Sequence, residues 1–446
     1  MVNKMNKIST LSVVGLGKLG SPMAAFFACR GYDVIGLDLN AEIVSSINEG
    51  KAPFEEPQLQ NYIDQSKNHI RATCDYQDAI LNSDVSFIIL PTPSMEDGFF
   101  SNDYLVDALG RIGQVLRQKS AYHLVVVTST VMPGSMDGIL RNAIEASSGR
   151  TIGENLGFCY HPEFIALGNI INNMLKPDFI LIGESDKKAA DLLEVIYTKT
   201  CAAPPIFRRM NFVNAELAKI AINTYVTTKI SYANMLAEMC DYLAGADVDI
   251  VTNAVGSDTR VGTKYLKGAL GYGGPCFPRD NKAFSALGDK LGVRCDLTVA
   301  TDNINNHQIA RMLGIIEGAV TLKSKIAILG LSYKPDTDVI DESQGVALAT
   351  SLSEAGYDIS VYDPMANENA RKFLPQTIII ADTLADCVIS ANLIVIMTPW
   401  PEFGALKSML NRSTHKNQTI VDPWRTLDHN DISENMKLLH LGVGSP

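Results

Sequence analysis

The sequence predicts an α/β protein in which two doubly wound domains are joined by a central helical region with a long helix. Near both ends of the chain, strand-length apolar runs alternate with helix-like segments, a pattern typical of βαβ units in a parallel sheet. Between them, residues 209–245 have helical periodicity and little glycine. At 446 residues the chain is long enough for two or three domains.

The first α/β region contains a glycine-rich turn, GLGKLG at 15–20, between an expected strand and an expected helix. The next strand ends at Asp38. The expected elements are a strand at 8–14, a helix at 21–30, and strands at 32–37, 85–90 and 124–128. The last two strands end in Pro91-Thr92-Pro93 and Ser129-Thr130-Val131, which places these residues where doubly wound sheets bind ligands.

A second alternating pattern begins at Lys325. Its segments are a strand in IAILGLSY at 326–333, a helix ending near Ala355-Gly356, and strands in DISVYDP at 358–364 and LIVIMTPW at 393–400. This predicts a second, smaller doubly wound domain. We therefore expect three domains, covering residues 1–205, 206–320 and 321–446.

Composition narrows the classes of partner. The net charge of −11 argues against general binding of nucleic acid or anionic membranes, although a local cluster of cations can still hold a phosphate. The apolar runs are too short to span a membrane, and the apolar run at the N-terminus leads into a glycine turn instead of a cleavage site, so we expect a cytoplasmic protein. The eight cysteines lack metal-ligand spacing, and we expect neither a metal site nor disulfides.

The GLGKLG turn predicts dinucleotide binding. Gly15 permits the tight turn, Gly17 lets the backbone approach a pyrophosphate, and Gly20 lets helix and strand pack closely. A carboxylate at Asp38 would accept hydrogen bonds from the adenosine ribose and repel a 2′-phosphate, which favours NAD over NADP. A surface-turn aspartate is the alternative interpretation of Asp38.

Two further segments contain candidate catalytic residues. In GYGGPCFPRD at 271–280, glycines and prolines fix an irregular loop around Cys276, and a nearby cation such as Arg279 or Lys219 would favour its thiolate. In AELAKIAINTYVTTKI at 215–230, Glu216, Lys219 and Asn223 share one helix face. A polar helix face is more often simply solvated.

These motifs together resemble the UDP-glucose/GDP-mannose dehydrogenase family over nearly the whole chain. The matching landmarks are GLGKLG, PTP at 91–93, STVMPG at 129–134, HPEF at 161–164, the helix at 215–230, DTRVG at 258–262, GYGGPCFPRD, GLSYKPDTD at 330–338 and TPWPEF at 398–403. The resemblance implies an N-terminal Rossmann-like NAD domain, a central dimerisation region and a C-terminal domain that helps bind a nucleotide-sugar.

By this resemblance, Cys276 is the covalent nucleophile. Lys219 and Asn223 would stabilise the oxyanion and orient water, with Asp280 beside them. Glu163 would act in proton transfer or hydrolysis, and Thr130 would lie near the reacting hydroxyl. NAD binding is assigned to Gly15, Gly17, Lys18, Leu19, Gly20, Asp38, Pro91, Thr92, Thr130 and Arg279. Nucleotide-sugar binding is assigned to Glu163, Phe164, Lys219, Asn223, Arg260, Lys267, Tyr272, Gly273 and Lys334, of which Arg260 would reach a neighbouring subunit's substrate.

The chain departs from the family pattern at several positions. Leu167 stands where a second glutamate is common, His161 replaces the usual asparagine, and Pro275 stands where serine is common. Arg279 stands where lysine is common. Asp341 takes the place of an arginine, which should weaken or reposition cofactor binding. These departures do not change the expected reaction class, but they leave the identity of the sugar open.

The sequence thus predicts four-electron oxidation of a nucleotide-sugar, with UDP-glucose or a related UDP-hexose first among the candidates, at C6 to the uronic acid, with two NAD consumed. It also predicts a homodimer through the central helical region, or a higher oligomer. Two alternatives stay open: a two-electron hydroxyacid-type dehydrogenase, and a nucleotide-sugar-binding homologue without catalysis.

Overall fold

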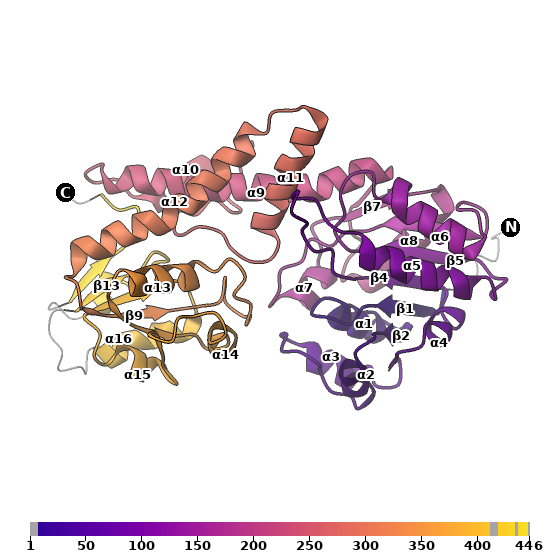
Figure 1. Ribbon diagram of the computed structural model, residues 1–446, viewed down its shortest axis with the longest axis horizontal. Coiled ribbons are helices and arrows are strands. Elements are labelled where there is room, and N and C mark those ends of the chain that lie inside the picture. Colours follow the sequence, from indigo (N-terminus) through magenta and orange to yellow (C-terminus); the bar gives the residue numbers. More distant parts are fainter. Residues whose placement is uncertain (1–7, 411–417, 433–435, 445–446) are drawn as a thin grey trace. The chain divides into compact units, whose positions relative to one another are not determined.

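The chain folds as two compact units, each built around its own β-sheet (Figure 1). The computed structural model describes residues 8–410, 418–432 and 436–444. The units comprise Met1–Ala221 and Ile222–Pro446, so the boundary between them falls inside helix α9, Phe212–Asp241. The predicted α/β class with two doubly wound sheets and a long helix is confirmed.

The first unit has an eight-stranded sheet in the order β3-β2-β1-β4-β5-β6-β7-β8. Its strands are β1 Thr10–Val14, β2 Asp33–Leu37, β3 Ile70–Thr73, β4 Val85–Ile88, β5 His123–Val127, β6 Leu156–Tyr160, β7 Ile180–Glu184 and β8 Phe207–Met210. All neighbours pair in parallel except β6 and β7, and the strands expected from the sequence all lie in the parallel part of the sheet. Apolar runs are alike in both strand directions, which is why the sequence pattern does not reveal the reversal.

Helices cover both faces of this sheet because each presents an apolar stripe to it. One core cluster contains side chains from α1, α3, α7 and α8, and the other contains side chains from α4, α5, η1, α6 and the start of α9. The helices are α1 Gly20–Cys29, α2 Ala41–Asn48, α3 Leu59–Gln65, α4 Tyr76–Leu81, α5 Asp103–Leu116, the π-helix η1 Met136–Leu140, α6 Arg141–Ser148, α7 Ile170–Leu175 and α8 Lys187–Thr200.

The second unit combines helices with a six-stranded parallel sheet in the order β11-β10-β9-β12-β13-β14. Its strands are β9 Lys325–Leu329, β10 Asp358–Tyr362, β11 Ile379–Ile380, β12 Leu393–Ile396, β13 Thr419–Val421 and β14 Lys437–Leu439. Its helices, besides the later part of α9, are α10 Val248–Ser257, α11 Phe277–Leu291, α12 Asp296–Ala319, α13 Gln344–Glu354, α14 Asn367–Ala370, α15 Leu384–Val388, η2 Pro401–Ala405, α16 Leu406–Leu410 and η3 His429–Asp431.

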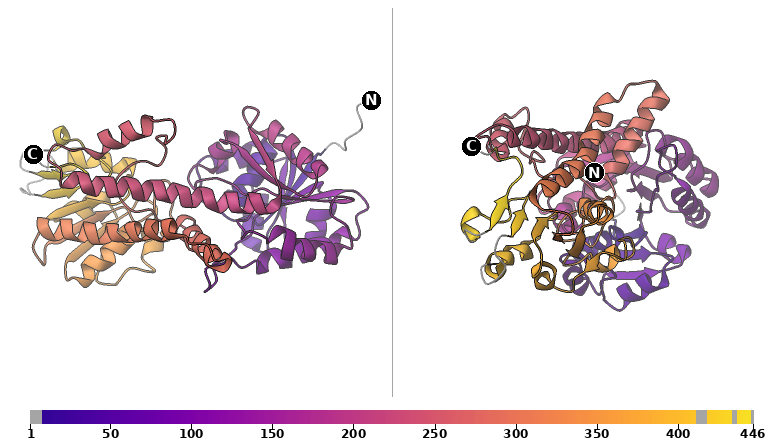
Figure 2. Two further views of the ribbon diagram at one scale, coloured as in Figure 1. Left: turned by 90° about the horizontal axis from the view of Figure 1, so that it is seen from above. Right: turned by 60° about the vertical axis from the view of Figure 1, so that its left-hand side comes forward.

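Within this unit, α12 lies alongside the later part of α9 (Figure 2). Ser231 of α9 donates to the carbonyl of Thr301, and Arg311 of α12 forms an ion pair with Asp241. The two long helices thus hold each other in register. Among the described helices, none is both long and apolar enough to cross a membrane.

Candidate active site

The turn between β1 and α1 has the backbone shape that a dinucleotide pyrophosphate needs. Gly15 has φ +94°, a conformation that L side chains rarely adopt, and its N–H donates to the carbonyl of Leu37 at 2.8 Å. A Cβ on Gly20 would lie 1.8 Å from the carbonyl oxygen of Gly15, whereas a Cβ on Gly17 would meet nothing within 4 Å. The turn is therefore closed around Gly15 and Gly20 and open at Gly17, beside the N-terminus of α1.

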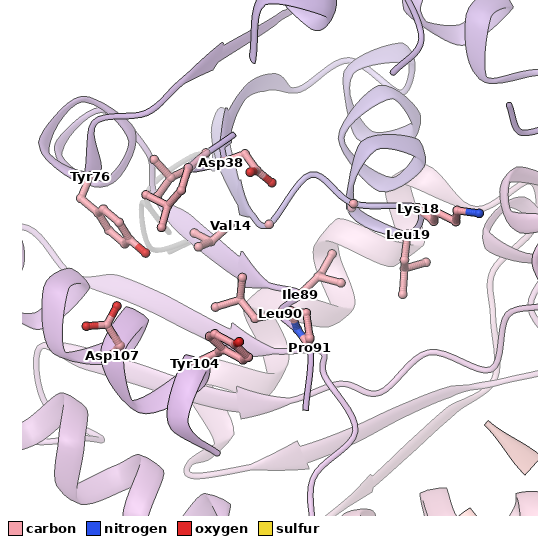
Figure 3. A pocket seen from close by; sticks show the side chains of 15 residues that line it. Val14, Lys18, Leu19, Asp38, Tyr76, Ile89, Leu90, Pro91, Tyr104 and Asp107 are labelled. Carbon is pink, nitrogen blue, oxygen red and sulfur yellow. The ribbon is translucent and has the colours of Figure 1, made fainter. Parts of the chain in front are cut away.

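Asp38, at the end of β2, lies beside this turn. Its carboxylate accepts the N–H of Leu16 at 2.7 Å and the N–H of Asn40 at 2.8 Å, which fixes its orientation. It borders a cavity of about 490 Å³ that also takes in the glycine turn (Figure 3). Tyr76 and Tyr104 line the same cavity.

Glu163 follows β6 and is held from several sides. Its Oε1 lies 3.3 Å from Nε2 of His161 and accepts the hydroxyl of Tyr197 at 3.3 Å. The ammonium of Lys219 donates to the backbone carbonyl of Glu163 at 2.6 Å and lies over the ring of Phe164. The first unit therefore brings together Glu163, Phe164 and Lys219.

Glu216 has a structural role. It is fully buried, and its carboxylate accepts the N–H of Gly134 and the N–H of Met136, both at 2.7 Å. Burial raises the pKa of this carboxyl, and the two N–H donors offset part of that rise. The polar face of α9 is thus not solvated, because Lys219 and Asn223 are buried as well.

The loop that carries Cys276 is anchored by two buried asparagines. The amide of Asn234 donates to the carbonyl of Leu270 and accepts the N–H of Ala269, while Asn305 makes the same pair of bonds with the backbone of Tyr272. Farther along, a Cβ on Gly273 would lie 2.3 Å from the carbonyl oxygen of Glu342, so only glycine fits there. These bonds, together with the bond from the N–H of Gly274 to the carbonyl of Asp341, anchor the loop up to two residues before the cysteine.

Cys276 is exposed and is the residue immediately before α11. The N–H groups of a helix start favour negative charge, and thus a thiolate, at this position. Behind it, the buried carboxylate of Asp280 accepts the amide of Asn223 at 2.6 Å and lies 3.2 Å from Nε of Arg279. The second unit therefore joins Asn223 and Arg279 to Asp280, whose N–H donates to the carbonyl of Cys276 one helical turn earlier.

The residues of the second unit that are predicted to bind the nucleotide-sugar differ in burial and in their contacts. Tyr272 is buried and donates its hydroxyl to Asp302 at 2.5 Å. Lys334 lies over the ring of Tyr333, which packs against Gly274 next to the predicted contact Gly273. Lys267 donates to the carbonyl of Trp424. Arg260 has an exposed side chain that pairs with Asp258 at 2.6 Å.

Three family models match the chain in order. They describe the NAD binding domain of the UDP-glucose/GDP-mannose dehydrogenase family over residues 9–201, its central domain over 213–307 and its UDP binding domain over 327–429. The chain belongs to the UDP-glucose/GDP-mannose dehydrogenase family. The resemblance seen in the sequence motifs is confirmed.

Individual relatives agree. A protein of Haloferax volcanii named UDP-glucose 6-dehydrogenase is 36% identical over 431 residues, which cover 95% of this chain and 99% of that one. A GDP-mannose 6-dehydrogenase of Pseudomonas aeruginosa is 33% identical, over 79% of this chain and 80% of its own. The solved UDP-glucose dehydrogenase of Pyrobaculum islandicum superposes with a TM-score of 0.86 at 30% identity, covering 98% and 99% of the two chains. The present chain is likewise an NAD-dependent oxidoreductase, as predicted.

The geometry of the β1–α1 turn suits NAD. Seven of the residues predicted to bind it line the cavity: Gly15, Gly17, Lys18, Leu19, Gly20, Asp38 and Pro91. Thr92 and Thr130 lie beyond that lining and bond to each other, Thr92 Oγ1 donating to the carbonyl of Thr130 at 2.8 Å. Individual residue roles in this dehydrogenase stay predictions.

Sequence reasoning missed part of the cavity wall, namely Tyr76, Tyr104 and Asp107. Tyr76 opens α4 and Tyr104 lies in the first turn of α5, so a search for aromatic residues at the starts of helices could have found them. Among the departures from the family pattern, Leu167 packs against the apolar core of the first unit. The backbone carbonyl of Asp341 accepts the N–H of Gly274, and Gly274 lies two residues before Cys276 in the chain.

Proposed function

We propose that the enzyme oxidises a nucleotide-sugar, with a UDP-hexose first among the candidates, at C6 to the uronic acid through a covalent bond to Cys276. The observation that carries this proposal is the exposed thiol at the start of α11, on an anchored loop and one helical turn before Asp280, which is bound to Asn223 and Arg279. A cysteine that served only packing would need no such loop.

The residue types fit a four-electron oxidation. Two hydrides leave the sugar carbon in two steps, and NAD held at the β1–α1 turn would supply the acceptor for each. After the first, the aldehyde has no hydroxyl-bearing tetrahedral carbon, and addition of the Cys276 thiolate restores one as a thiohemiacetal. The second hydride loss leaves a thioester. In the proposed scheme Lys219 and Asn223 stabilise oxyanions, and Glu163 accepts the proton of the hydrolytic water.

The family models and relatives support the substrate class. The C-terminal model describes a UDP binding domain, and the Haloferax volcanii relative is named for UDP-glucose. The order of the three models also supports our three-domain division at residues 205 and 320. For the central region we propose a homodimer interface, because α9 and α12 expose large apolar side chains: Tyr225, Tyr232, Met239, Leu297 and Val299.

The test measures NADH formation at 340 nm over a panel of UDP- and GDP-sugars. We expect Cys276→Ser and Cys276→Ala to lower acid formation by about 10³-fold or more while NAD affinity is retained. Cys74, an exposed cysteine of the first unit, provides the matched control, and Cys74→Ser should keep wild-type turnover. Unchanged acid formation in both Cys276 variants would refute the covalent step.

The stoichiometry separates the alternatives. Two NADH per sugar fit the four-electron reaction, and one fits a hydroxyacid-type dehydrogenase. Tight nucleotide-sugar binding without NADH from any substrate would favour a homologue without catalysis.

A further inference from the structure

His161 is a buried histidine whose hydrogen bonds determine where its protons lie. Its side chain is 2% exposed, and Nδ1 lies 2.8 Å from the carbonyl oxygen of Leu181 on β7. A carbonyl oxygen only accepts, so Nδ1 carries the hydrogen. In a neutral ring Nε2 then has a lone pair and no hydrogen.

Nε2 of His161 faces a carboxylate. It lies 3.3 Å from Oε1 of Glu163, whose side chain is 11% exposed. Two lone pairs facing each other in a buried site repel, and the contact becomes attractive only when one proton lies between nitrogen and oxygen. The pair is therefore built to hold one proton, as an imidazolium with a carboxylate or as an imidazole with a carboxylic acid.

Tyr197 completes the arrangement. Its ring packs against that of His161 with centroids 4.6 Å apart, and its hydroxyl donates to the same Oε1. Burial, and then the charge of Glu163, raise the pKa of Tyr197 well above its usual value, so the hydroxyl stays protonated and does not compete as a base.

The other charged or titratable groups around Glu163 do not take over this proton. The ammonium of Lys219 is directed at the backbone carbonyl of Glu163. Burial and the charge of Glu163 raise the pKa of Cys201 to about 11, so its thiol stays protonated. Arg30 donates to the carbonyls of Thr200 and Cys201.

We propose that His161 is a positioning residue that shares one proton with Oε1 of Glu163, which leaves Oε2 of the same carboxylate to take up the proton released in hydrolysis. This deepens the proposed function and rests on it. In the hydrolytic step an O–H bond of water breaks, its oxygen bonds to the thioester carbon, and its proton passes to Oε2 of Glu163, because Oε1 already shares a proton with Nε2 of His161. The electron pair of the C–S bond then leaves on the sulfur of Cys276.

The test replaces His161 with asparagine, the residue usual in the family, which keeps a polar side chain but has no titrating ring. For His161→Asn we expect kcat to fall about 10- to 100-fold, the acid side of the kcat–pH profile to change, and KM for NAD to stay within about twofold. The thioester on Cys276 should accumulate, giving a burst of two NADH per active site and an acyl adduct in the intact mass. A purely structural role would lower the melting temperature without moving the pH profile.

A matched control is available in the same unit. Exposed His69 also pairs with a carboxylate, its Nδ1 lying 2.8 Å from Asp33, and His69→Asn should keep the wild-type kcat–pH profile. Tyr197→Phe, which removes only a hydroxyl, should move the acid side less than His161→Asn does. Wild-type profiles in both the His161 and the Tyr197 variants would overturn the proposal.

A second measurement is independent of turnover. In ¹⁵N spectra of histidine-labelled enzyme at neutral pH, we expect Nε2 of His161 to report a shared proton and to lose it in Glu163→Gln, where no carboxylate remains. Identical Nε2 signals in the two proteins would contradict the shared proton. If instead the wild type released one NADH or none per sugar, the proposed function would fail while this result still decided the pairing.

Discussion

The first turns of the two sheets have almost the same backbone. Gly15 after β1 has φ +94° and Gly330 after β9 has φ +101°, and each donates its N–H to the end of the neighbouring strand at 2.8 Å. A Cβ on Gly20 would lie 1.8 Å from the oxygen of Gly15, and one on Gly345 would lie 2.1 Å from the oxygen of Gly330. Each sheet thus has a tight turn with a close-packed helix behind it.

The acids beside the two turns differ. Asp38 borders a cavity, whereas Asp363 is 1% exposed and is surrounded by donors. Those donors are the N–H groups of Leu331, Ser332, Met365 and Ala366, the hydroxyl of Ser332 and the indole of Trp400. A glycine turn followed by an acid is therefore not sufficient for a ribose site, because Trp400 covers the second acid.

Among the variants that compare the two sheets, Asp363→Asn should have the largest effect on the unfolding free energy. The amide nitrogen that replaces one carboxylate oxygen would face N–H donors in a buried site, so we expect a loss of about 3 kcal/mol in unfolding free energy. Urea unfolding measures this, and an NAD titration should give an unchanged dissociation constant. A variant as stable as wild type would show that the buried acid contributes no more than a neutral side chain.

Asp38→Asn should show the opposite behaviour. We expect NAD affinity to fall about tenfold or more, preference over NADP to weaken, and the unfolding free energy to change by about 1 kcal/mol or less. Isothermal titration with both cofactors, alongside the same urea curves, checks this. Equal losses of stability in the Asp38 and Asp363 variants would remove the distinction between the turns.

A smaller difference lies inside the sheets. Where β1 pairs with β4, Ser12 faces Ser86, and Ser86 in turn lies 2.8 Å from Nε2 of His123. The equivalent pair in the second sheet is Ala327 with Ile394. The first sheet therefore contains a buried titratable group that the second lacks at the matching positions.

Because of this buried histidine, we expect the unfolding free energy of the protein to fall at acid pH. Burial, and then the charges of Lys119 and Arg150, lower the pKa of His123 well below its usual value. Below about pH 6.5 the unfolded chain binds a proton that the folded chain refuses, so stability falls as pH falls, by at most about 1.4 kcal/mol per pH unit. We expect His123→Gln to flatten the decline measured by unfolding at pH 7 and pH 5. An equally steep decline in the variant would assign the acid sensitivity elsewhere.

The sequence predicted local motifs, such as the glycine turn, better than it predicted strand direction or contacts between distant residues. GLGKLG and Asp38 could be read from the sequence because each position has its own backbone or charge requirement. The direction of β7 could not, since apolar alternation does not depend on direction. Nor could the contact of Tyr197 with Glu163, because it joins residues 34 apart in the chain through packing alone.

The carboxylate of Glu216 joins the turn after Thr130 to the start of α9. Two charge-assisted bonds inside a dry core make that joint stiff, so the threonine turn and the helical turn bearing Lys219 move as one piece. We therefore expect the amide protons of Gly134 and Met136 to exchange with solvent only when the first turns of α9 open. Deuterium uptake at those two positions thus reports on the mobility of the helix that carries the lysine.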